Sequence, residues 1–388
     1  MSDKAPLVIV GTGLAGYNLA KEVRKLDAER ELVLITADDG RFYSKPLLST
    51  GFAKAKEADE LAMHTAVSMA EQLTASVLDY TRVTAIDPQQ RLLQLGDREL
   101  AYSELVLAVG AEPRRLPWAD ELGEQLLSIN DLLDYARFRS AVQDKQRVVI
   151  IGAGLIGCEF ANDLAAGGFQ VTVVASDPYL MPQLIPEPVA AAVQAQLEAL
   201  GVVFHLGCAI ESLEGNEQGV HMRLDDGSRV SADQALSAIG LAPRLDLAEQ
   251  AGLAIGRGIV VDRHLATSQA HIYALGDCAE VNGLNLMYVM PLMTAARALA
   301  KTLCGDRSAL SYPAMPVMVK TPACPLVVAP PLTAESGHWR TTGEGADLQA
   351  LFHDEQGQLH GFALTGNRVA EKLKLTRELP GWLLPVAG

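Results

Sequence analysis

The sequence predicts an α/β protein in which two similar parallel-sheet units are followed by a small C-terminal α+β domain. Two glycine-rich segments, "LVIVGTGLAG" at residues 7–16 and "VVIIGAGLIGCEF" at 148–160, each open with an apolar run. Two later segments, "LVLAVGAEP" at 105–113 and "ALSAIGLAP" at 235–243, share the pattern A-x-G-x-x-P. From about residue 313 the chain becomes rich in proline. A chain of 388 residues is also longer than one ordinary core, so several domains are expected.

The first unit begins with the apolar strand "PLVIV", which runs into a glycine-rich turn and then into a segment with helical apolar spacing. A second strand, "ELVLITADD", follows at residues 31–39. In this context G-x-G-x-x-G binds a dinucleotide, because the missing side chains let backbone N–H groups and a helix N-terminus approach the pyrophosphate. The residues predicted to form this cradle are Gly11, Thr12, Gly13, Leu14, Ala15 and Gly16.

The second unit repeats this arrangement with the strand "RVVII", the helix "CEFANDLAAGG" and the strand "FQVTVVASD". Its predicted cradle consists of Gly152, Gly154, Leu155, Ile156 and Gly157. In both units the A-x-G-x-x-P segment is predicted to cross under the cofactor and turn away. Cofactor contacts are therefore also expected at Ala108, Gly110 and Gly240. The recurrence of strand, turn, helix and crossing segment indicates an internal duplication.

An acid that ends the second strand of such a unit accepts a hydrogen bond from the ribose of the cofactor. In the first unit the candidate is Asp38, for which a solvated turn residue is the alternative. In the second unit the expected position holds Ala175, and Asp177 stands two residues further on. No arginine is present there to meet a 2′-phosphate, so the sequence favours NADH over NADPH.

Three charged residues are candidates for a catalytic role. Glu159 lies two residues past Gly157, either as an acid placed by the helix dipole or as a buried carboxylate that orients the cofactors or pairs with a lysine. Lys45, in "RFYSKPLLSTGF", and Lys320, in "VMVKTPACP", have aromatic and apolar neighbours. This surrounding favours partly enclosed cations beside a cofactor over ordinary solvated lysines.

The segments after the second unit hold further candidates. In "HIYALGDCAEV" at 271–281, a buried strand presents Gly276 and then Asp277, with nothing bulky before the acid. Strands are predicted around 348–365 and a last helix near 366–379. The positive residues of this helix, a possible docking surface for an acidic partner or else a solvated face, are Arg368, Lys372, Lys374 and Arg377.

Composition excludes several classes of function. The formal charge of −15 repels nucleic acid and anionic membranes at long range. The five cysteines form no C-x-x-C or C-x-x-x-x-C pair, and the scattered histidines complete no metal site. No apolar run approaches the length of a membrane helix, and the N-terminus lacks a signal peptide, which predicts a cytoplasmic protein without membrane insertion.

Together these features resemble the FAD-dependent pyridine-nucleotide–disulfide oxidoreductase superfamily over essentially the whole chain. The resemblance implies a glutathione-reductase-like fold with two Rossmann-like domains. FAD would bind to 1–110 and 245–312, NADH to 111–244, and 313–388 would form an interface domain. It also implies that Asp277 bonds the FAD ribitol, that Val83 meets the adenine through its backbone, and that Val289 lies near the isoalloxazine ring.

Departures from the superfamily pattern narrow the expected function. No cysteine pair stands beside the flavin, and "LSTG" places Thr50 where related NADH oxidases carry a cysteine. The segments "YSKPLLSTGF", "GLIGCEFANDL" and "VKTPACPLVV" resemble the rubredoxin-reducing members, which implies rubredoxin as the partner and a supply of electrons to alkane hydroxylation. Flavorubredoxin reductases, ferredoxin reductases of oxygenase systems, NADH oxidases and non-enzymatic flavin sensors remain alternatives. A monomer and a homodimer are both compatible with the sequence.

Overall fold

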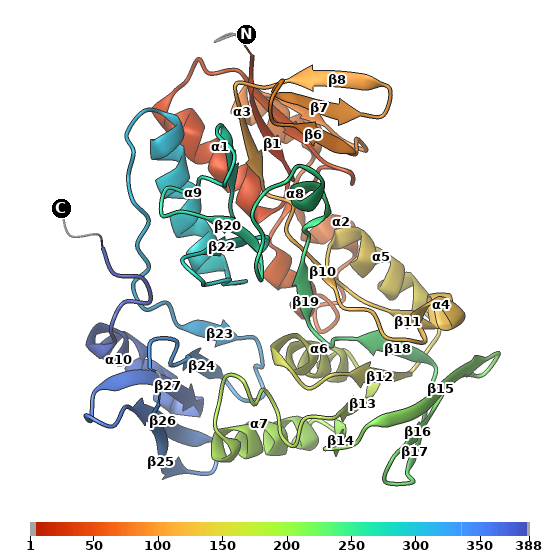
Figure 1. Ribbon diagram of the computed structural model, residues 1–388. Coiled ribbons are helices and arrows are strands. Elements are labelled where there is room, and N and C mark those ends of the chain that lie inside the picture. Colours follow the sequence, from red (N-terminus) through yellow and green to blue (C-terminus); the bar gives the residue numbers. More distant parts are fainter. Residues whose placement is uncertain (1–4, 335, 386–388) are drawn as a thin grey trace.

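The computed structural model describes residues 5–334 and 336–385 and confirms the predicted fold class (Figure 1). Two parallel sheets and one antiparallel sheet organise this part of the chain. Residues 1–4, 335 and 386–388, which the predicted domain limits include, lie outside the described residues.

The first parallel sheet has the strand order β21-β9-β1-β2-β5. The bounds of these strands are β1 (Leu7–Val10), β2 (Leu32–Ile35), β5 (Ser76–Leu78), β9 (Glu104–Leu107) and β21 (Ile272–Ala274). The central strand β1 is apolar and buried along its whole length, as expected for a parallel sheet covered on both faces. Helix α1 (Leu14–Leu26) follows β1 and packs beside α9 (Val289–Leu303) (Figure 1).

The second parallel sheet has the order β11-β18-β12-β13-β14, and its strands β18-β12-β13-β14 repeat the topology of β9-β1-β2-β5. The edge strands differ, because β11 precedes the other strands of its sheet in sequence and β21 follows those of the first sheet. The strands of the second sheet are β11 (Leu126–Leu127), β12 (Arg147–Ile151), β13 (Gln170–Ala175), β14 (Val203–Leu206) and β18 (Gln234–Ser237). Strand β12 is central, as β1 is in the first sheet, and the helices of this unit include α6 (Leu155–Ala166) and α7 (Glu187–Ala199). The matching strand orders agree with the internal duplication that the glycine motifs indicated.

Each unit also carries an antiparallel meander. The strands of the two meanders are β6 (Ala85–Asp87), β7 (Leu92–Leu95), β8 (Arg98–Ala101), β15 (Ile210–Asn216), β16 (Gly219–Leu224) and β17 (Arg229–Ala232). Smaller two-stranded pairings join β3 (Phe42–Tyr43) to β4 (Ala62–His64) and β20 (Ile259–Val261) to β22 (Ala279–Val281).

The chain leaves the first unit and returns to it through two adjacent strands. Strand β10 (Ala111–Pro113) pairs antiparallel with β19 (Leu241–Pro243), so the outgoing and returning segments lie side by side. After its return the chain supplies β21 and α9, which complete the first sheet and cover it. The first unit is therefore discontinuous in sequence.

The C-terminal sheet is antiparallel, in the order β23-β24-β27-β26-β25, and is followed by η3 (Gly366–Glu371) and α10 (Lys372–Glu378). Its strands are β23 (Val317–Val319), β24 (Leu326–Ala329), β25 (His338–Glu344), β26 (Asp347–His353) and β27 (Leu359–Thr365). The sequence indicated strands only around 348–365, because the prolines of the preceding segment obscured the rest. Those prolines flank β23 and β24 without entering them, which leaves the ladder hydrogen bonds intact.

The C-terminal sheet packs on the second unit and shares its hydrophobic core. Val319 and Leu326 belong to the same buried cluster as Val189 and Val193 of α7. The remaining helical segments are η1 (Lys45–Thr50), α2 (Ala58–Leu61), α3 (Ala66–Leu73), α4 (Ala119–Leu122), η2 (Gly123–Gln125), α5 (Leu132–Ala141) and α8 (Asp246–Gln250). Among residues 5–334 and 336–385, no helix is both long and apolar enough to cross a membrane.

Candidate active site

In the first glycine turn, two glycines are crowded by neighbouring backbone and one faces open space. Gly11 has a φ of +113°, and a Cβ there would lie 2.2 Å from the carbonyl oxygen of Ala108. A Cβ on Gly16 would lie 1.8 Å from the carbonyl oxygen of Gly11. Gly13, which caps α1, would in contrast place its Cβ in open space. Two glycines thus allow close packing of strand, helix and crossing segment, and the third leaves the helix N-terminus accessible.

The second glycine turn repeats this geometry. A Cβ on Gly152 would lie 2.5 Å from the carbonyl oxygen of Ala238, and one on Gly157 would lie 2.0 Å from that of Gly152. Gly154, at the N-cap of α6, again faces open space. Ala108 and Ala238 are the alanines of the two A-x-G-x-x-P segments, so the shared pattern reflects backbone passing next to the first glycine. Both turns fit a dinucleotide pyrophosphate placed against a helix N-terminus.

The two predicted ribose acids lie at different distances from their strands. Asp38 stands three residues beyond the end of β2, and its Oδ1 accepts hydrogen bonds from the Thr36 hydroxyl at 2.6 Å and from the Gly40 N–H at 3.0 Å. This oxygen therefore stabilises a turn. Asp177 follows β13 by two residues, and its backbone carbonyl accepts from the Gly207 N–H at 2.8 Å. A ribose contact for either carboxylate stays a prediction.

Lys45 lies at the start of η1, where it meets residues of both parallel-sheet units. Its Nζ donates to Oδ1 of Asn130 at 2.7 Å and lies 3.8 Å from the Asp277 carboxylate. Asn130 is buried and is itself oriented by donating from Nδ2 to the Ala111 carbonyl at 2.9 Å. Burial lowers the pKa of Lys45, and the Asp277 carboxylate partly opposes this effect. No local sequence pattern points to Asn130 as a site residue.

Glu159, Lys320 and Ser49 form a second polar cluster. Glu159 is fully buried on α6, and both of its carboxylate oxygens contact the Lys320 ammonium, at 2.7 and 2.8 Å. Its Oε1 also accepts from the Lys320 backbone N–H at 2.9 Å, and its Oε2 accepts from the Ser49 hydroxyl at 2.6 Å. The buried carboxylate and its lysine partner, left open by the sequence, are thus present. Ser49 was missed, although it stands in the same "LSTG" segment as Thr50.

Helix α6 holds two further loops through buried side chains. Asn162 accepts from the Ala323 N–H at 3.0 Å, and Asp163 accepts from the backbone N–H groups of Phe52 and Ala53 at 2.9 and 3.0 Å. Burial raises the pKa of Asp163, and these backbone donors oppose the increase. The buried face of α6 therefore fixes both the end of η1 and the loop that carries Lys320. The sequence pattern does not reveal these two roles, because the apolar spacing of a helix does not show which of its polar residues are buried.

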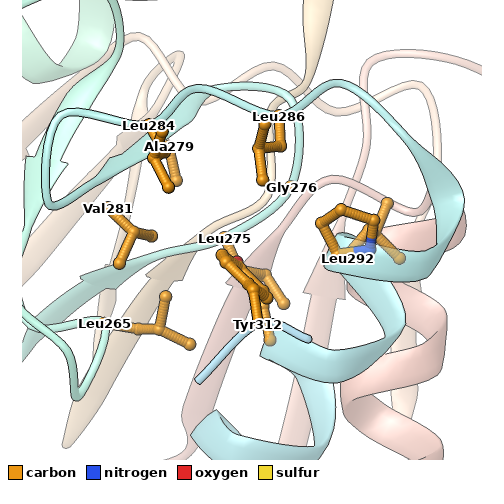
Figure 2. A pocket seen from close by; sticks show the side chains of 11 residues that line it. Leu265, Leu275, Gly276, Ala279, Val281, Leu284, Leu286, Leu292 and Tyr312 are labelled. Carbon is orange, nitrogen blue, oxygen red and sulfur yellow. The ribbon is translucent and has the colours of Figure 1, made fainter. Parts of the chain in front are cut away.

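The turn at Gly276 and Asp277 is supported by an apolar cavity of about 10 Å³, which has room for at most one water molecule (Figure 2). Leu275, Leu292 and Tyr312 are among the side chains that line it. A cavity of this size is part of the packing behind the turn. Asn285 bonds the Asp277 carbonyl at 3.0 Å and thereby fixes the chain just before α9.

Two other predicted cofactor residues, Val289 and Val83, differ in their exposure to solvent. Val289 is the first residue of α9 and is 36% exposed, so the helix begins at the surface. Val83 is buried in the core of the first unit. In sum, the structure brings Glu159 together with Lys320, and Lys45 together with Asp277, at opposite ends of η1.

All five cysteines are free thiols. Burial raises the pKa of Cys158 to about 12, with a contribution from Glu159, and raises the pKa values of Cys278 and Cys324 to about 11. Such thiols are protonated and unreactive near neutral pH. Within the described part of the chain, no group of three or more histidine, cysteine or acidic side chains could hold a metal ion.

Comparisons with known proteins agree with this geometry. The family description "Pyridine nucleotide-disulphide oxidoreductase" matches residues 5–300, and "Rubredoxin binding C-terminal domain" matches residues 309–379. A rubredoxin-NAD(+) reductase of Alcanivorax borkumensis is 51% identical and covers 97% of this chain and 98% of its own length. A nitric oxide reductase FlRd-NAD(+) reductase of Vibrio vulnificus is 38% identical, with 98% of each chain covered.

Solved structures show the same architecture. The complex of putidaredoxin reductase with putidaredoxin matches with a TM-score of 0.87 and 26% identity, over 98% of this chain and 94% of that one. The family match spans both glycine turns, the Lys45 cluster and Glu159. The chain belongs to the pyridine nucleotide-disulphide oxidoreductase family.

Proposed function

We propose that the protein is an FAD-dependent NADH:rubredoxin oxidoreductase. The observation that carries this proposal is the Glu159–Lys320 contact. It joins the helix that follows the second dinucleotide turn to residues 309–379, the part that matches the rubredoxin-binding domain. The 51% identity to a rubredoxin-NAD(+) reductase over nearly the whole chain supports the same assignment.

We assign FAD, the cofactor of this family, to the first glycine turn and NADH to the second. The corresponding domains are 1–110 with 245–312 for FAD, 111–244 for NADH, and 313–388 for the partner interface. The pairing of β10 with β19 supports these limits, because the chain leaves and re-enters the first unit there. Ser176 and Asp177, which follow β13, bring no positive charge for a 2′-phosphate, which supports NADH over NADPH.

The protein would contribute orientation and electrostatics to the reaction. When bound, FAD supplies the ability to accept two electrons from NADH together and to release them singly. Gly152, Gly154 and Gly157 would seat NADH against the N-terminus of α6, and Glu159 is the fifth residue of that helix. Lys45 and Lys320 would provide positive charge toward a reduced ring, and each is held by an acid, Asp277 or Glu159.

Electrons would leave directly to a docked protein, because the buried thiols offer no sulfur relay. In α10, Lys374 and Arg377 are exposed, and the Lys372 ammonium lies 3.6 Å from the Met318 sulfur, two residues before Lys320. This basic helix therefore adjoins the strand that leads to the Glu159–Lys320 pair. A local basic surface can attract an acidic partner despite the overall charge of −15.

The proposal is tested by NADH-driven reduction of cytochrome c with and without added rubredoxin. We expect rubredoxin to raise the rate, because it would carry single electrons from the reductase to cytochrome c. A [2Fe–2S] ferredoxin in its place should give little increase. Equal rates with ferredoxin would contradict the assignment, and rapid peroxide formation without any protein acceptor would favour an NADH oxidase. The 38% identity to a nitric oxide reductase FlRd-NAD(+) reductase makes flavorubredoxin a third acceptor to compare.

Reversing the charge of the α10 surface should weaken rubredoxin binding selectively. We expect K374E/R377E to raise the KM for rubredoxin on the order of tenfold at low salt, since each lost charge contact is worth about 0.5–1 kcal/mol. The rate of flavin reduction by NADH should not change. The matched control R98E/R229E reverses two exposed charges on β8 and β17. Equal KM increases in both variants would argue against docking on α10.

We also propose that the protein acts in the cytoplasm, where NADH is available. Free thiols at all five cysteines support a reducing compartment. A fractionation of cells that express the untagged protein would test this placement.

A further inference from the structure

We propose that Ser49 is a positioning residue that holds the Glu159 carboxylate in one orientation, and that Lys320 is the movable partner of that carboxylate. This inference rests on the proposed function, in which NADH binds next to Glu159. In this proposal Ser49 affects the reaction by orienting Glu159.

The Ser49 hydroxyl has one proton and two acceptors within reach. Glu159 Oε2 lies at 2.6 Å, whereas the Pro46 carbonyl lies at 3.3 Å. The charged and closer acceptor takes the proton, because hydrogen bonds to ionised groups are shorter and stronger. Ser49 is 4% exposed and Glu159 is 0% exposed, so water does not compete for this contact.

The backbone that carries Ser49 is held in place by the residues that follow it. Ser49 lies at a kink within η1, with φ −87° and ψ 25°. The residue after Thr50 is Gly51, at which a Cβ would lie 2.3 Å from the Tyr135 hydroxyl oxygen. The next residue, Phe52, is bonded to Asp163 of the same helix that carries Glu159. The Ser49 hydroxyl is therefore a donor with little freedom to move relative to α6.

The Lys320 ammonium is held less tightly. Its side chain is 28% exposed, whereas the Glu159 side chain is 1% exposed. The ammonium ends a flexible four-carbon stem, but the Lys320 backbone N–H is a fixed donor to Oε1 at 2.9 Å. If the ammonium moves toward a bound cofactor, each oxygen of the Glu159 carboxylate still has a fixed donor. Oε2 keeps the Ser49 hydroxyl, and Oε1 keeps the Lys320 backbone N–H.

The Ser49 hydroxyl and the Lys320 backbone N–H explain how the buried Glu159 carboxylate can release the Lys320 ammonium. A carboxylate without hydrogen bonds is costly to bury, so without these donors Glu159 would turn away when the ammonium leaves. The charged and titratable neighbours of Glu159 include Lys320 and the adjacent Cys158 thiol. Ser49 thus permits Lys320 to move while Glu159 stays in place.

The test uses the holoenzyme and two measurements. In anaerobic stopped-flow with increasing NADH, S49A should reduce flavin about tenfold more slowly, with an unchanged NADH concentration at half-maximal rate. In hydrogen exchange, the peptide that contains the Lys320 amide should exchange faster in S49A, because that amide loses its oriented acceptor. S49T, which keeps the hydroxyl, should restore both values.

T50A is the matched control, since the Thr50 hydroxyl donates to the Leu47 carbonyl at 2.9 Å in the same turn. It removes a hydroxyl from η1 without removing a donor to Glu159. If S49A does not fold, S49C offers a side chain of similar size with a weak donor, and it should give the same two changes.

Wild-type values in S49A would overturn the proposal, as would equal changes in S49A and T50A. Neither measurement requires a protein acceptor, so the wrong choice of rubredoxin would not affect them. If NADH failed to reduce the wild-type flavin, the proposed function would fail, and the hydrogen exchange would still decide whether Ser49 holds Glu159.

Discussion

The G16A protein should be obtained without bound flavin. A Cβ at this position would lie 1.8 Å from the Gly11 carbonyl oxygen, far inside van der Waals contact. Relief requires α1 to move away from the turn after β1, which separates the helix N-terminus from the phosphate position. We expect this loss of flavin even though alanine stabilises a helix interior by about 1 kcal/mol relative to glycine. The measurement is the ratio of flavin to protein absorbance after purification.

G157A is the comparison for this prediction. Its Cβ would be almost as crowded, at 2.0 Å from the Gly152 carbonyl oxygen, but in the second unit. We expect G157A to retain its yellow colour and to lose reduction by NADH. Tight flavin binding by G16A, or flavin loss in both variants, would contradict the assignment of one cofactor to each turn.

G154E should bind FAD normally and lose affinity for NADH by on the order of 100-fold. Gly154 caps α6 with an extended backbone, and a Cβ there meets nothing within 4 Å, so the longer side chain can be accommodated. An acid at a helix N-terminus favours the fold. It also repels a pyrophosphate, and a repulsion of about 3 kcal/mol corresponds to this loss. The measurement is the NADH dependence of the flavin reduction rate.

G154Q separates the charge from the size of the new side chain. We expect it to weaken NADH binding much less than G154E does. Both variants should unfold at or above the wild-type temperature, since the fold has space for either side chain. Equal losses in the two variants would show that steric exclusion, rather than charge, controls access to this turn.

The sequence predicted the repeated parts of the fold because their function restricts backbone geometry. Gly11, Gly16, Gly152 and Gly157 must lack a side chain, so they are visible as a pattern. The side chains that meet at the candidate site could be anticipated only in part. Lys45, Glu159 and Lys320 stand out as charges in apolar segments. Their contacts with Asn130 and Ser49 depend on packing between units and could not be inferred from local spacing.

The domain limits and the cofactor contacts of the site residues stay predictions, as does the pathway that the protein serves. Asp38 uses one carboxylate oxygen within its own turn, which neither requires nor excludes a ribose contact. The supply of electrons to alkane hydroxylation concerns a process beyond the reductase, and no side chain reports on it.

The network around Glu159 also has a consequence for the order of events during folding. Its donors Ser49 and Lys320 are 110 and 161 residues away along the chain. Contacts of such long range form slowly, after the local elements, because closing the loop costs entropy before the contact stabilises the chain. The network around Glu159 should thus mature late, and on the ribosome its assembly must await synthesis of Lys320 itself.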